Sequence, residues 1–261
     1  MKKYMLLIVA GALSVAWGSS RETVTLAGST AFQPFAEKLA EHFIAAHPKA
    51  QIDVQGGGSA VGVQSALTGA AQIGMADLLV LPPEAKGLTS TVVARDGIAI
   101  VVHPANPLKG LTAVQAKDLF SGKISNWKGL GGADAPVRVI SREEGSGTRR
   151  SFDKLVLKGE KLAPNALYQN SNGTIREAVA SDPQAVSYLS IGLLNEKVKG
   201  LPFDGVAPTN ENVKKGNYPL ARPVFFLTKG APTGVAKAFI DYVVSAEGQK
   251  LLEKEGLIAA K

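Results

Sequence analysis

The sequence predicts an α/β protein made of two doubly wound lobes. Three times a short hydrophobic strand runs into a turn of Gly, Ser or Thr and then into a helix, and the third such unit lies in the second half of the chain. After removal of an N-terminal leader about 240 residues remain, enough for two medium-sized cores. The chain has no cysteine, so packing must stabilise both lobes without disulfides.

The N-terminus predicts a secretory signal peptide over residues 1–18. Lys2 and Lys3 precede an uncharged apolar stretch from Met5 to Trp17, and cleavage after Gly18 fits the small residues there. The stretch is too short to span about 30 Å of hydrocarbon. A lipid anchor would need a cysteine, so we expect a periplasmic protein of a Gram-negative cell that is not lipid-anchored.

The first unit consists of a β-rich strand over 23–27, the turn Gly28-Ser29-Thr30 and a helix. Thr30 and Gln33 have the spacing of a capping box at the start of this helix. Its core-facing stripe, at i, i+3, i+4 spacing, is formed by Phe32, Phe35, Ala36, Leu39 and Phe43.

The second unit is a strand over 51–54, a glycine-rich turn ending at Ser59 and a small-residue helix that continues to Leu67. A further short strand over 73–75 ends beside Asp77. We expect these strands to lie side by side in one sheet, with their carboxyl ends at a common edge.

A hydrophobic strand over 98–102 leads into a Pro-rich segment, where we expect the chain to cross into the second lobe. The third unit follows, with a strand over 137–140, a turn over 141–148 and a helix carrying Phe152. Later strands are expected over 186–189 and 224–228, with a return crossing at Arg222-Pro223, and two helices over 233–258. Lobe 1 is therefore assigned residues 19–101 plus 224–261, and lobe 2 residues 102–223.

The charge balance is basic, with a formal net charge of +7 that falls to +5 when Lys2 and Lys3 leave. Such a balance suits nucleic acid, an anionic surface or an anionic ligand. Most lysines stand in polar, turn-rich stretches typical of solvated surface, and no basic strip is interleaved with aromatic residues. Nucleic acid is therefore not an expected partner.

The three turns that open helices are candidate anion-binding elements. A helix N-terminus leaves backbone N–H groups unpaired and carries partial positive charge, so several converging N-termini can hold an anion. Glycine lets the backbone approach closely, and serine or threonine adds a hydroxyl donor. Each turn alone is more often an ordinary helix cap than a binding site.

Two charged residues, Arg142 and Asp77, indicate which kind of anion the turns would bind. Arg142 stands four residues before Ser146, and a guanidinium can donate two parallel hydrogen bonds to a tetrahedral oxyanion; the alternative is a surface arginine paired with Glu143 or Glu144. Asp77 would suit an anion that still carries a proton, because a carboxylate accepts from P–OH but is left unpaired against sulfate. The alternative role of Asp77 is that of an ordinary acid in a loop or at a helix cap.

Together these segments resemble the periplasmic phosphate-binding proteins of Pst-type ABC transporters, in order and over essentially the whole mature chain. The most specific parts are the run Phe120-Ser121-Gly122-Lys123-Ile124-Ser125-Asn126-Trp127 and the Arg-x-x-Gly-Ser-Gly-Thr loop over 142–148. The resemblance implies the type II periplasmic-binding-protein fold, in which two α/β lobes are joined by two hinge crossovers and phosphate binds in the cleft between them.

The resemblance also implies the site residues. Phosphate would be bound from lobe 1 by Ser29, Thr30, Ser59 and the proton acceptor Asp77, and from lobe 2 by Arg142, Ser146, Gly147 and Thr148. Asn172 would be an edge contact. Some relatives have an arginine just after the position of Asp77, where this chain has Leu78 and Leu79. The family implies a monomer that delivers phosphate to permease subunits in the inner membrane, without a metal or cofactor.

Two alternatives remain open. A secreted phosphate-ester hydrolase would need a nucleophile with a base, or metal ligands, whereas the chain offers only His42, His47 and His103, without metal-ligand spacing. We therefore expect no catalytic residues. The same fold could also bind or sense another oxyanion such as arsenate or molybdate, since fold does not fix the ligand. The acid at Asp77 favours a protonated anion, which fits arsenate better than molybdate.

Overall fold

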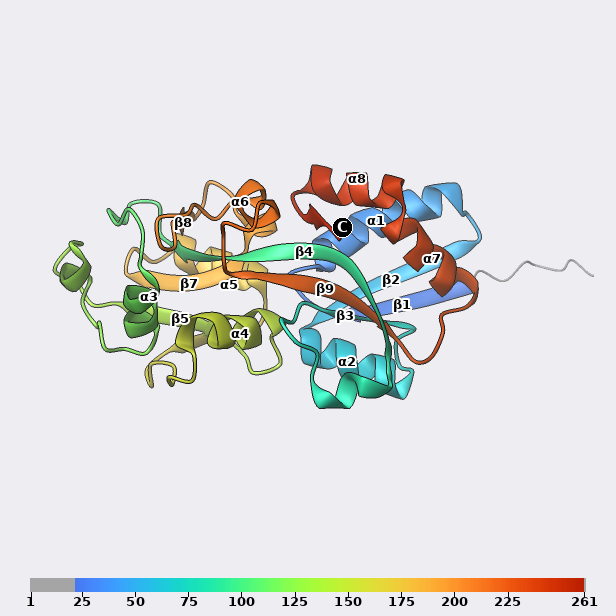
Figure 1. Cartoon of the computed structure of the whole chain (residues 1–261), viewed down its shortest axis with the longest axis horizontal. Coiled ribbons are helices and arrows are strands. Elements are labelled where there is room, and N and C mark those ends of the chain that lie inside the picture. Colours follow the sequence, from blue (N-terminus) through green and yellow to red (C-terminus); the bar gives the residue numbers. More distant parts are fainter. Residues whose placement is uncertain (1–21, 261) are drawn as a thin grey trace, which may run out of the picture.

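Two α/β halves lie end to end along the long axis of the computed structural model, which describes residues 22–260 (Figure 1). The strands are β1 Glu22–Gly28, β2 Ala50–Gly57, β3 Ile73–Ala76, β4 Thr89–Val102, β5 Arg138–Arg142, β6 Leu167–Gln169, β7 Ala185–Ser190, β8 Lys199–Leu201, β9 Ala221–Thr228 and β10 Ile258–Ala259. The helices are α1 Gln33–Ala46, α2 Ser59–Thr68, α3 Ala113–Phe120, α4 Gly147–Phe152, α5 Asn172–Ala180, α6 Asn210–Lys214, α7 Gly234–Val244 and α8 Ala246–Glu255.

Each half contains a parallel sheet edged by antiparallel strands. In the first half β1 pairs in parallel with β2 and β3, and β3 then pairs antiparallel with β9. In the second half β5 pairs in parallel with β6 and β7, while β7 and β8 run antiparallel to β4. The predicted strand, turn and helix units therefore form the parallel parts. The antiparallel strands arise where the chain passes between the halves and returns.

The strands β4 and β9 connect the halves and are called the hinge strands here (Figure 1). They pair antiparallel as far as Gly97 opposite Ala221, and from Ile98 onward β4 pairs with β7 and β8 instead. The sequence predicted only the apolar part of β4, from Ile98. The preceding part was missed because it carries Arg95 and Asp96, which break the hydrophobic pattern.

Each half buries its own apolar core. In the first half the predicted stripe on α1 is buried, and Phe43 meets Phe239 of α7 edge to face with ring centroids 5.3 Å apart. In the second half Phe152 stacks on Tyr188 with centroids 4.0 Å apart. The two cores are separate clusters. Each half is thus a packed unit of its own, joined to the other through the hinge strands.

The start of α1 differs from the prediction. The expected capping box of Thr30 and Gln33 is wrong: the Oγ of Ser29 accepts from the N–H of Phe32 at 3.1 Å, and the Gln33 amide donates to Glu37 instead. Ser29 can reach that N–H because the turn after β1 places it three residues before Phe32. The hydroxyl of Thr30 is therefore available for partners in the other half.

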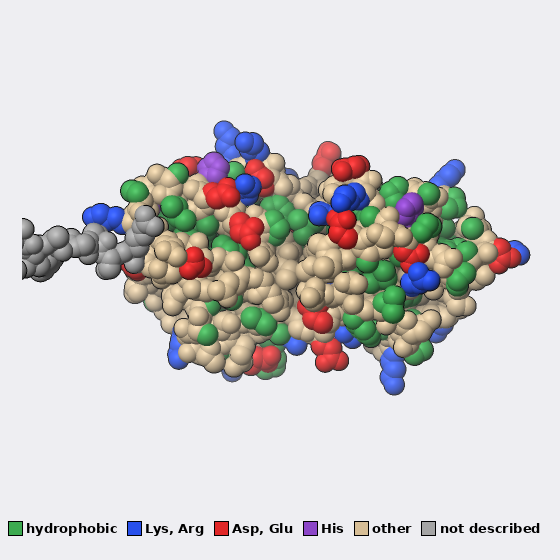
Figure 2. Space-filling view, turned by 180° about the vertical axis from the view of Figure 1, so that it is seen from behind, with side chains coloured by type: hydrophobic (Ala, Val, Ile, Leu, Met, Phe, Trp, Pro, Cys, Tyr) green, Lys and Arg blue, Asp and Glu red, His purple; other side chains and the backbone are tan. Residues whose placement is uncertain are grey.

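The predicted signal peptide over 1–18 lies outside the described residues. Within 22–260, no helix is long and apolar enough to cross a membrane. On the face shown in Figure 2, basic and acidic side chains are interspersed over both halves.

Candidate functional site

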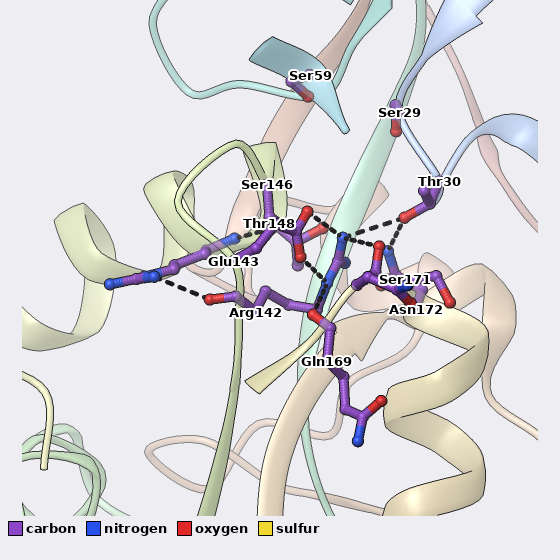
Figure 3. A network of polar contacts seen from close by, with 12 residues as sticks. Ser29, Thr30, Ser59, Arg142, Glu143, Ser146, Thr148, Gln169, Ser171 and Asn172 are labelled. Atoms are coloured by element: carbon purple, nitrogen blue, oxygen red, sulfur yellow. Dashed lines mark hydrogen bonds and ion pairs between the residues drawn. The ribbon is translucent and has the colours of Figure 1, made fainter. Parts of the chain in front are cut away.

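The candidate site lies at the seam between the halves, where the turn after β1 and the N-termini of α2 and α4 meet (Figure 3). Side chains from both halves hydrogen-bond to one another there. The predicted site residues Ser29, Ser59, Asp77, Arg142, Ser146, Gly147 and Thr148 are buried, and Thr30 is half-buried. The structure thus brings residues far apart in the sequence into one enclosed polar cluster, which we call the cleft.

Asp77 joins the two halves through its carboxylate. Ser59 Oγ donates to Asp77 Oδ1 at 2.6 Å, and Thr148 Oγ1 of α4 donates to Oδ2 at 3.1 Å. The N–H of Asp77 donates back to Ser59 Oγ at 3.1 Å. Asp77 lies in the loop directly after β3, but only 2% of its surface is exposed and its carboxylate accepts from side-chain hydroxyls, not from the N–H groups of a helix end. It is a buried acceptor at the centre of the cleft.

Arg142 ends β5 and points into the cleft with only 1% of its surface exposed. Its Nε donates to Glu143 Oε2 at 3.0 Å and to the carbonyl of Gln169 at 3.1 Å, and its Nη2 donates to Glu143 Oε1 at 2.9 Å. The alternative of a surface arginine paired with Glu143 or Glu144 is therefore wrong in its position, since Arg142 is buried, but the pairing with Glu143 is present. Glu143 rather than Glu144 orients the guanidinium. Among the described residues, its buried Nη1 has no hydrogen-bond partner.

Thr30 receives two donors from the opposite half. Arg142 Nη2 and Asn172 Nδ2 both donate to Thr30 Oγ1, each at 3.3 Å (Figure 3). Asn172 is the first residue of α5 and is buried, and its Oδ1 accepts from the N–H of Ser190 at 3.1 Å. Asn172, expected only at the edge, is thus fixed inside the cleft.

Glycine is required where α4 meets the first half. A methyl group on Gly147 would lie 2.2 Å from Ser59 Oγ and 2.6 Å from Asp77 Oδ1, too close for any side chain. Next to this contact the N–H of Ala60 donates to the carbonyl of Gly145 at 3.0 Å. The N-terminal turns of α2 and α4 therefore touch through their backbones.

Two of the predicted hydroxyls act as local caps. Ser29 Oγ accepts from the N–H of Phe32, and Ser146 Oγ accepts from the N–H of Arg149 at 3.2 Å. Ser146 is the N-cap of α4, so the ordinary capping role describes its side chain. Both residues shape the turns whose backbone faces the cleft.

Two further charged residues lie in this cluster and were not predicted as site residues. Arg222 of β9 is fully buried, and its Nη2 lies 2.7 Å from Asp77 Oδ2, 2.9 Å from Asp96 Oδ2 and 3.2 Å from Thr148 Oγ1. Asp96 of β4 also accepts from Ser190 Oγ at 2.8 Å. Burial raises the pKa of Asp96, against the lowering effects of the Arg222 charge and of that hydrogen bond.

A signal for both residues was present in the sequence. Arg222 precedes a run of apolar residues in β9, and Asp96 stands just before the apolar part of β4. A charged residue beside a strand that must be buried needs a partner. Arg222-Pro223 was expected only at the return crossing between the lobes.

The chemistry of the cleft is that of an oxyanion receptor. Helix N-termini, hydroxyls and the Arg142 guanidinium supply donors, and Asp77 supplies one buried acceptor. Among residues 22–260 no group of three or more His, Cys, Asp or Glu side chains is placed to hold a metal ion. His47 stacks on Phe43, and His103 Nδ1 lies 3.1 Å from the N–H of Ala105, so both belong to local structure outside the cleft.

Comparison with known proteins agrees with this geometry. A family model described as a PBP superfamily domain matches residues 14–247. The phosphate-binding protein PstS of Bacillus subtilis (strain 168) is 39% identical over 232 residues, which are 87% of this chain and 77% of that protein.

Solved structures show the same fold. A putative phosphate ABC transporter substrate-binding protein from Clostridium perfringens, solved with bound phosphate, has a TM-score of 0.89 at 39% identity and covers 92% of this chain and 100% of its own. An ABC-type phosphate transport receptor from Vibrio cholerae has a TM-score of 0.75 at 36% identity over 91% of this chain and 100% of its own. The predicted two-lobed α/β fold is confirmed, and the chain belongs to the PstS family within the PBP superfamily.

Proposed function

We propose that this chain captures inorganic phosphate in the cleft between its lobes and delivers it to the permease of an ABC importer. The observation that carries the proposal is Arg142: its guanidinium is buried and oriented by Glu143, and among the described residues its Nη1 has no partner. A buried N–H group without a partner is costly, and an anion in the cleft would remove that cost. Relatives named as phosphate-binding proteins support the same ligand.

The proposed contacts come from both lobes. The hydroxyl of Thr30, the guanidinium of Arg142 and the first backbone N–H groups of α2 and α4 would donate to phosphate oxygens. The hydroxyls of Ser59 and Thr148 each have one proton and donate it to Asp77 here, so to donate to phosphate they would have to turn away from that carboxylate. Asp77 would accept from the P–OH group. Gly147 would contribute through its backbone N–H. Ser29 and Ser146 would contribute by shaping their turns, because their own N–H groups donate to the carbonyls of Met75 and Glu143. The long 3.3 Å bonds to Thr30 Oγ1 are weak enough to be exchanged for bonds to a ligand.

Delivery follows from closure of the lobes. We propose a division into 19–101 plus 224–261 and 102–223. The change of β4 from β9 to β7 and β8 after Gly97 supports a crossing within a few residues of these boundaries. Phosphate that bonds to both lobes favours the closed form, and a permease can recognise that form selectively. Membership of the PstS family makes the chain a binding component of a transporter and not an enzyme. We propose that it acts as a monomer.

The location belongs to the proposal as well. Lys2, Lys3 and the apolar stretch that follows support a signal peptide over 1–18 and export from the cytoplasm. The absence of cysteine from the sequence supports a periplasmic protein that carries no lipid on a cysteine side chain and meets its permease subunits at the inner membrane.

Calorimetric titration tests the ligand. The mature protein is unfolded, stripped of ligand, refolded and titrated with phosphate, then with sulfate, arsenate and molybdate as competitors. We expect 1:1 binding of phosphate, competition by arsenate and none by sulfate. If phosphate fails to bind while another oxyanion binds, the ligand is wrong although the cleft is an oxyanion site. If none of the four binds, the proposed function is wrong.

A further inference from the structure

Asp77 presents a problem of charge. It is a buried carboxylate in a cleft that we propose binds an anion, and two leucines follow it in the sequence. A buried ionised carboxylate without a partner is costly and takes up a proton instead. A protonated Asp77 would donate a hydrogen bond and lose its use as an acceptor. The structure must therefore supply a positive charge from elsewhere in the chain.

The charge comes from Arg222 on the hinge strand β9. Its Nη2 lies 2.7 Å from Asp77 Oδ2, and its side chain is fully buried. Arg222 stands directly opposite Asp96 in the pairing of β9 with β4, so the cross-strand register of the hinge fixes where the guanidinium lies. The contact to Thr148 Oγ1 adds a bond to the second half.

Two carboxylates share this single guanidinium. The groups that face Asp77 are the hydroxyls of Ser59 and Thr148, Arg222, and Asp96 beyond it. Across the cleft Arg142 and Glu143 pair with each other, so their charges largely cancel. Burial raises the pKa of Asp96, against the lowering effect of the Arg222 charge. Arg222 Nη2 lies 2.7 Å from Asp77 Oδ2 and 2.9 Å from Asp96 Oδ2, so the guanidinium contacts both carboxyl groups and is slightly nearer to Asp77.

We propose that Arg222 is a positioning residue that holds Asp77 ionised and oriented as an acceptor, so that the cleft selects an oxyanion that carries a proton. The guanidinium does this from the hinge strand β9, through its Nη2 contact to Asp77 Oδ2. The identity of the oxyanion rests on the proposed function; the effect of Arg222 on the Asp77 carboxyl does not.

Removal of Arg222 should therefore change selectivity. Without the guanidinium, Asp77 would take up a proton and become a hydrogen-bond donor. A donor at this position could bond to an oxygen of fully deprotonated sulfate. A merely structural role for Arg222 would weaken all anions alike. The ratio of phosphate affinity to sulfate affinity separates these two roles.

The first experiment compares Arg222→Gln with the native chain by calorimetric titration at neutral pH. We expect the phosphate-to-sulfate affinity ratio to fall by about tenfold or more, since a site loses discrimination when its polar partner changes from acceptor to donor. The matched control is Arg138→Gln, an arginine that pairs with Asp182 on the exposed end of β5, which should keep the ratio. An unchanged ratio in Arg222→Gln would overturn the proposal.

A second variant keeps the test valid if Arg222→Gln does not fold. The double variant Arg222→Gln/Asp96→Asn removes the buried pair together and leaves no orphaned charge at Asp96, so it should fold better than the single variant. Asp77 still lacks its guanidinium, and the ratio should fall as before. If the double variant has the native ratio of phosphate to sulfate affinity, Arg222 only compensates the charge of Asp96, and the proposal is wrong. Arg222→Lys, which keeps the charge, should stay closer to the native ratio.

A measurement without any oxyanion separates this inference from the proposed function. In ligand-stripped protein, the ¹³C chemical shift of the Asp77 carboxyl carbon, assigned with Asp77→Asn, should be that of a carboxylate in the native chain and of a carboxylic acid in both Arg222→Gln variants at neutral pH. That result supports the inference even if phosphate does not bind. A carboxylate shift in the variants overturns it, whatever the native chain binds.

Discussion

Arg142 and Arg138 stand at opposite ends of β5 in opposite surroundings. Arg138 lies at the surface, where it pairs with Asp182, whereas Arg142 is buried against main-chain carbonyls and Glu143. An arginine held on three sides by acceptors is preorganised, because little side-chain entropy remains to be lost on binding. Its position therefore suits Arg142, and not Arg138, to bind an anion.

Replacement of Arg142 by alanine should weaken phosphate binding by about 2 kcal/mol or more, the cost of a lost charge-assisted hydrogen bond. Calorimetric titration measures the change. Arg138→Ala is the control and should bind phosphate as the native chain does. If Arg142→Ala binds phosphate with native affinity, Arg142 is not a ligand of the anion.

Gly147→Ala should abolish tight phosphate binding although it adds only one methyl group. That methyl would lie 2.2 Å from Ser59 Oγ, so α4 would be forced away from the first half and the cleft could not close. The control is Gly173→Ala, near the start of α5, where the nearest atom to the added methyl is 3.7 Å away. Calorimetric titration should show weakened phosphate binding in Gly147→Ala alone, and small-angle scattering should show that only this variant fails to become more compact when phosphate is added. Compaction of Gly147→Ala with phosphate would contradict the prediction.

At the scale of elements, the N-terminus of α5 carries Asn172 into the cleft. Ser171 caps this helix in a capping box with Thr174, and Thr112 caps α3 in the same way with Gln115, away from the cleft. The two caps are chemically alike. A comparison of variants at the two caps therefore distinguishes the loss of stability caused by losing any helix cap from an effect on phosphate binding.

Ser171→Ala and Thr112→Ala should each lower the free energy of unfolding by about 1 kcal/mol. Only Ser171→Ala should also weaken phosphate binding severalfold, because fraying of the first turn of α5 moves Asn172 away from Thr30. Urea unfolding and titration of both variants measure the two effects. Equal phosphate affinity in the two variants would remove α5 from the site.

The elements that the sequence predicted correctly are those set by local patterns. The strand at 23–27 and the apolar stripe of α1 follow from periodicity, and the three turns follow from their glycines and hydroxyls. The three-residue strands β6 and β8 carry too little pattern to be recognised. The capping box at Thr30 failed because Ser29 offered a competing local bond.

The parts of the cleft that escaped prediction depend on contacts between distant segments. Arg222 meets Asp77 and Asp96 only because β9 returns between β3 and β4, and no local pattern encodes that return. In the same way, Asn172 meets Thr30 through a contact between the two halves, across 142 positions of the sequence. The family resemblance indicated residues such as Asp77 and Arg142, whereas the strand order of the sheet brings Arg222 to them.

At the scale of the whole molecule, two buried tyrosines make the fold sensitive to alkali. Burial raises the pKa of Tyr188 and of Tyr218 above the ordinary value. Tyr188 hydrogen-bonds with Ser141, and the Tyr218 hydroxyl donates to the carbonyl of Ile98 at 2.8 Å. Both phenols stay protonated in the fold at a pH where an unfolded chain ionises them.

The free energy of unfolding should therefore fall as the pH rises above about 10, the pKa of a tyrosine in the unfolded chain, with a slope of up to about 1.4 kcal/mol per pH unit for each tyrosine. In that range the folded state binds more protons than the unfolded state, which sets the sign. Urea unfolding between pH 8 and 11 gives the slope. Tyr188→Phe/Tyr218→Phe should flatten it, and an equally steep slope in that variant would assign the effect to other groups.

The unbroken course of β4 determines how the lobes can move. The strand passes from the first sheet into the second without a loop, and at the crossing it is hydrogen-bonded to β9. A two-stranded ribbon tolerates more twist than a wide sheet. We expect opening of the lobes to twist these two strands, so that the backbone hydrogen bonds of the hinge can persist. The balance between open and closed forms would accordingly depend on the twist of the hinge strands and not on the ordering of a loop.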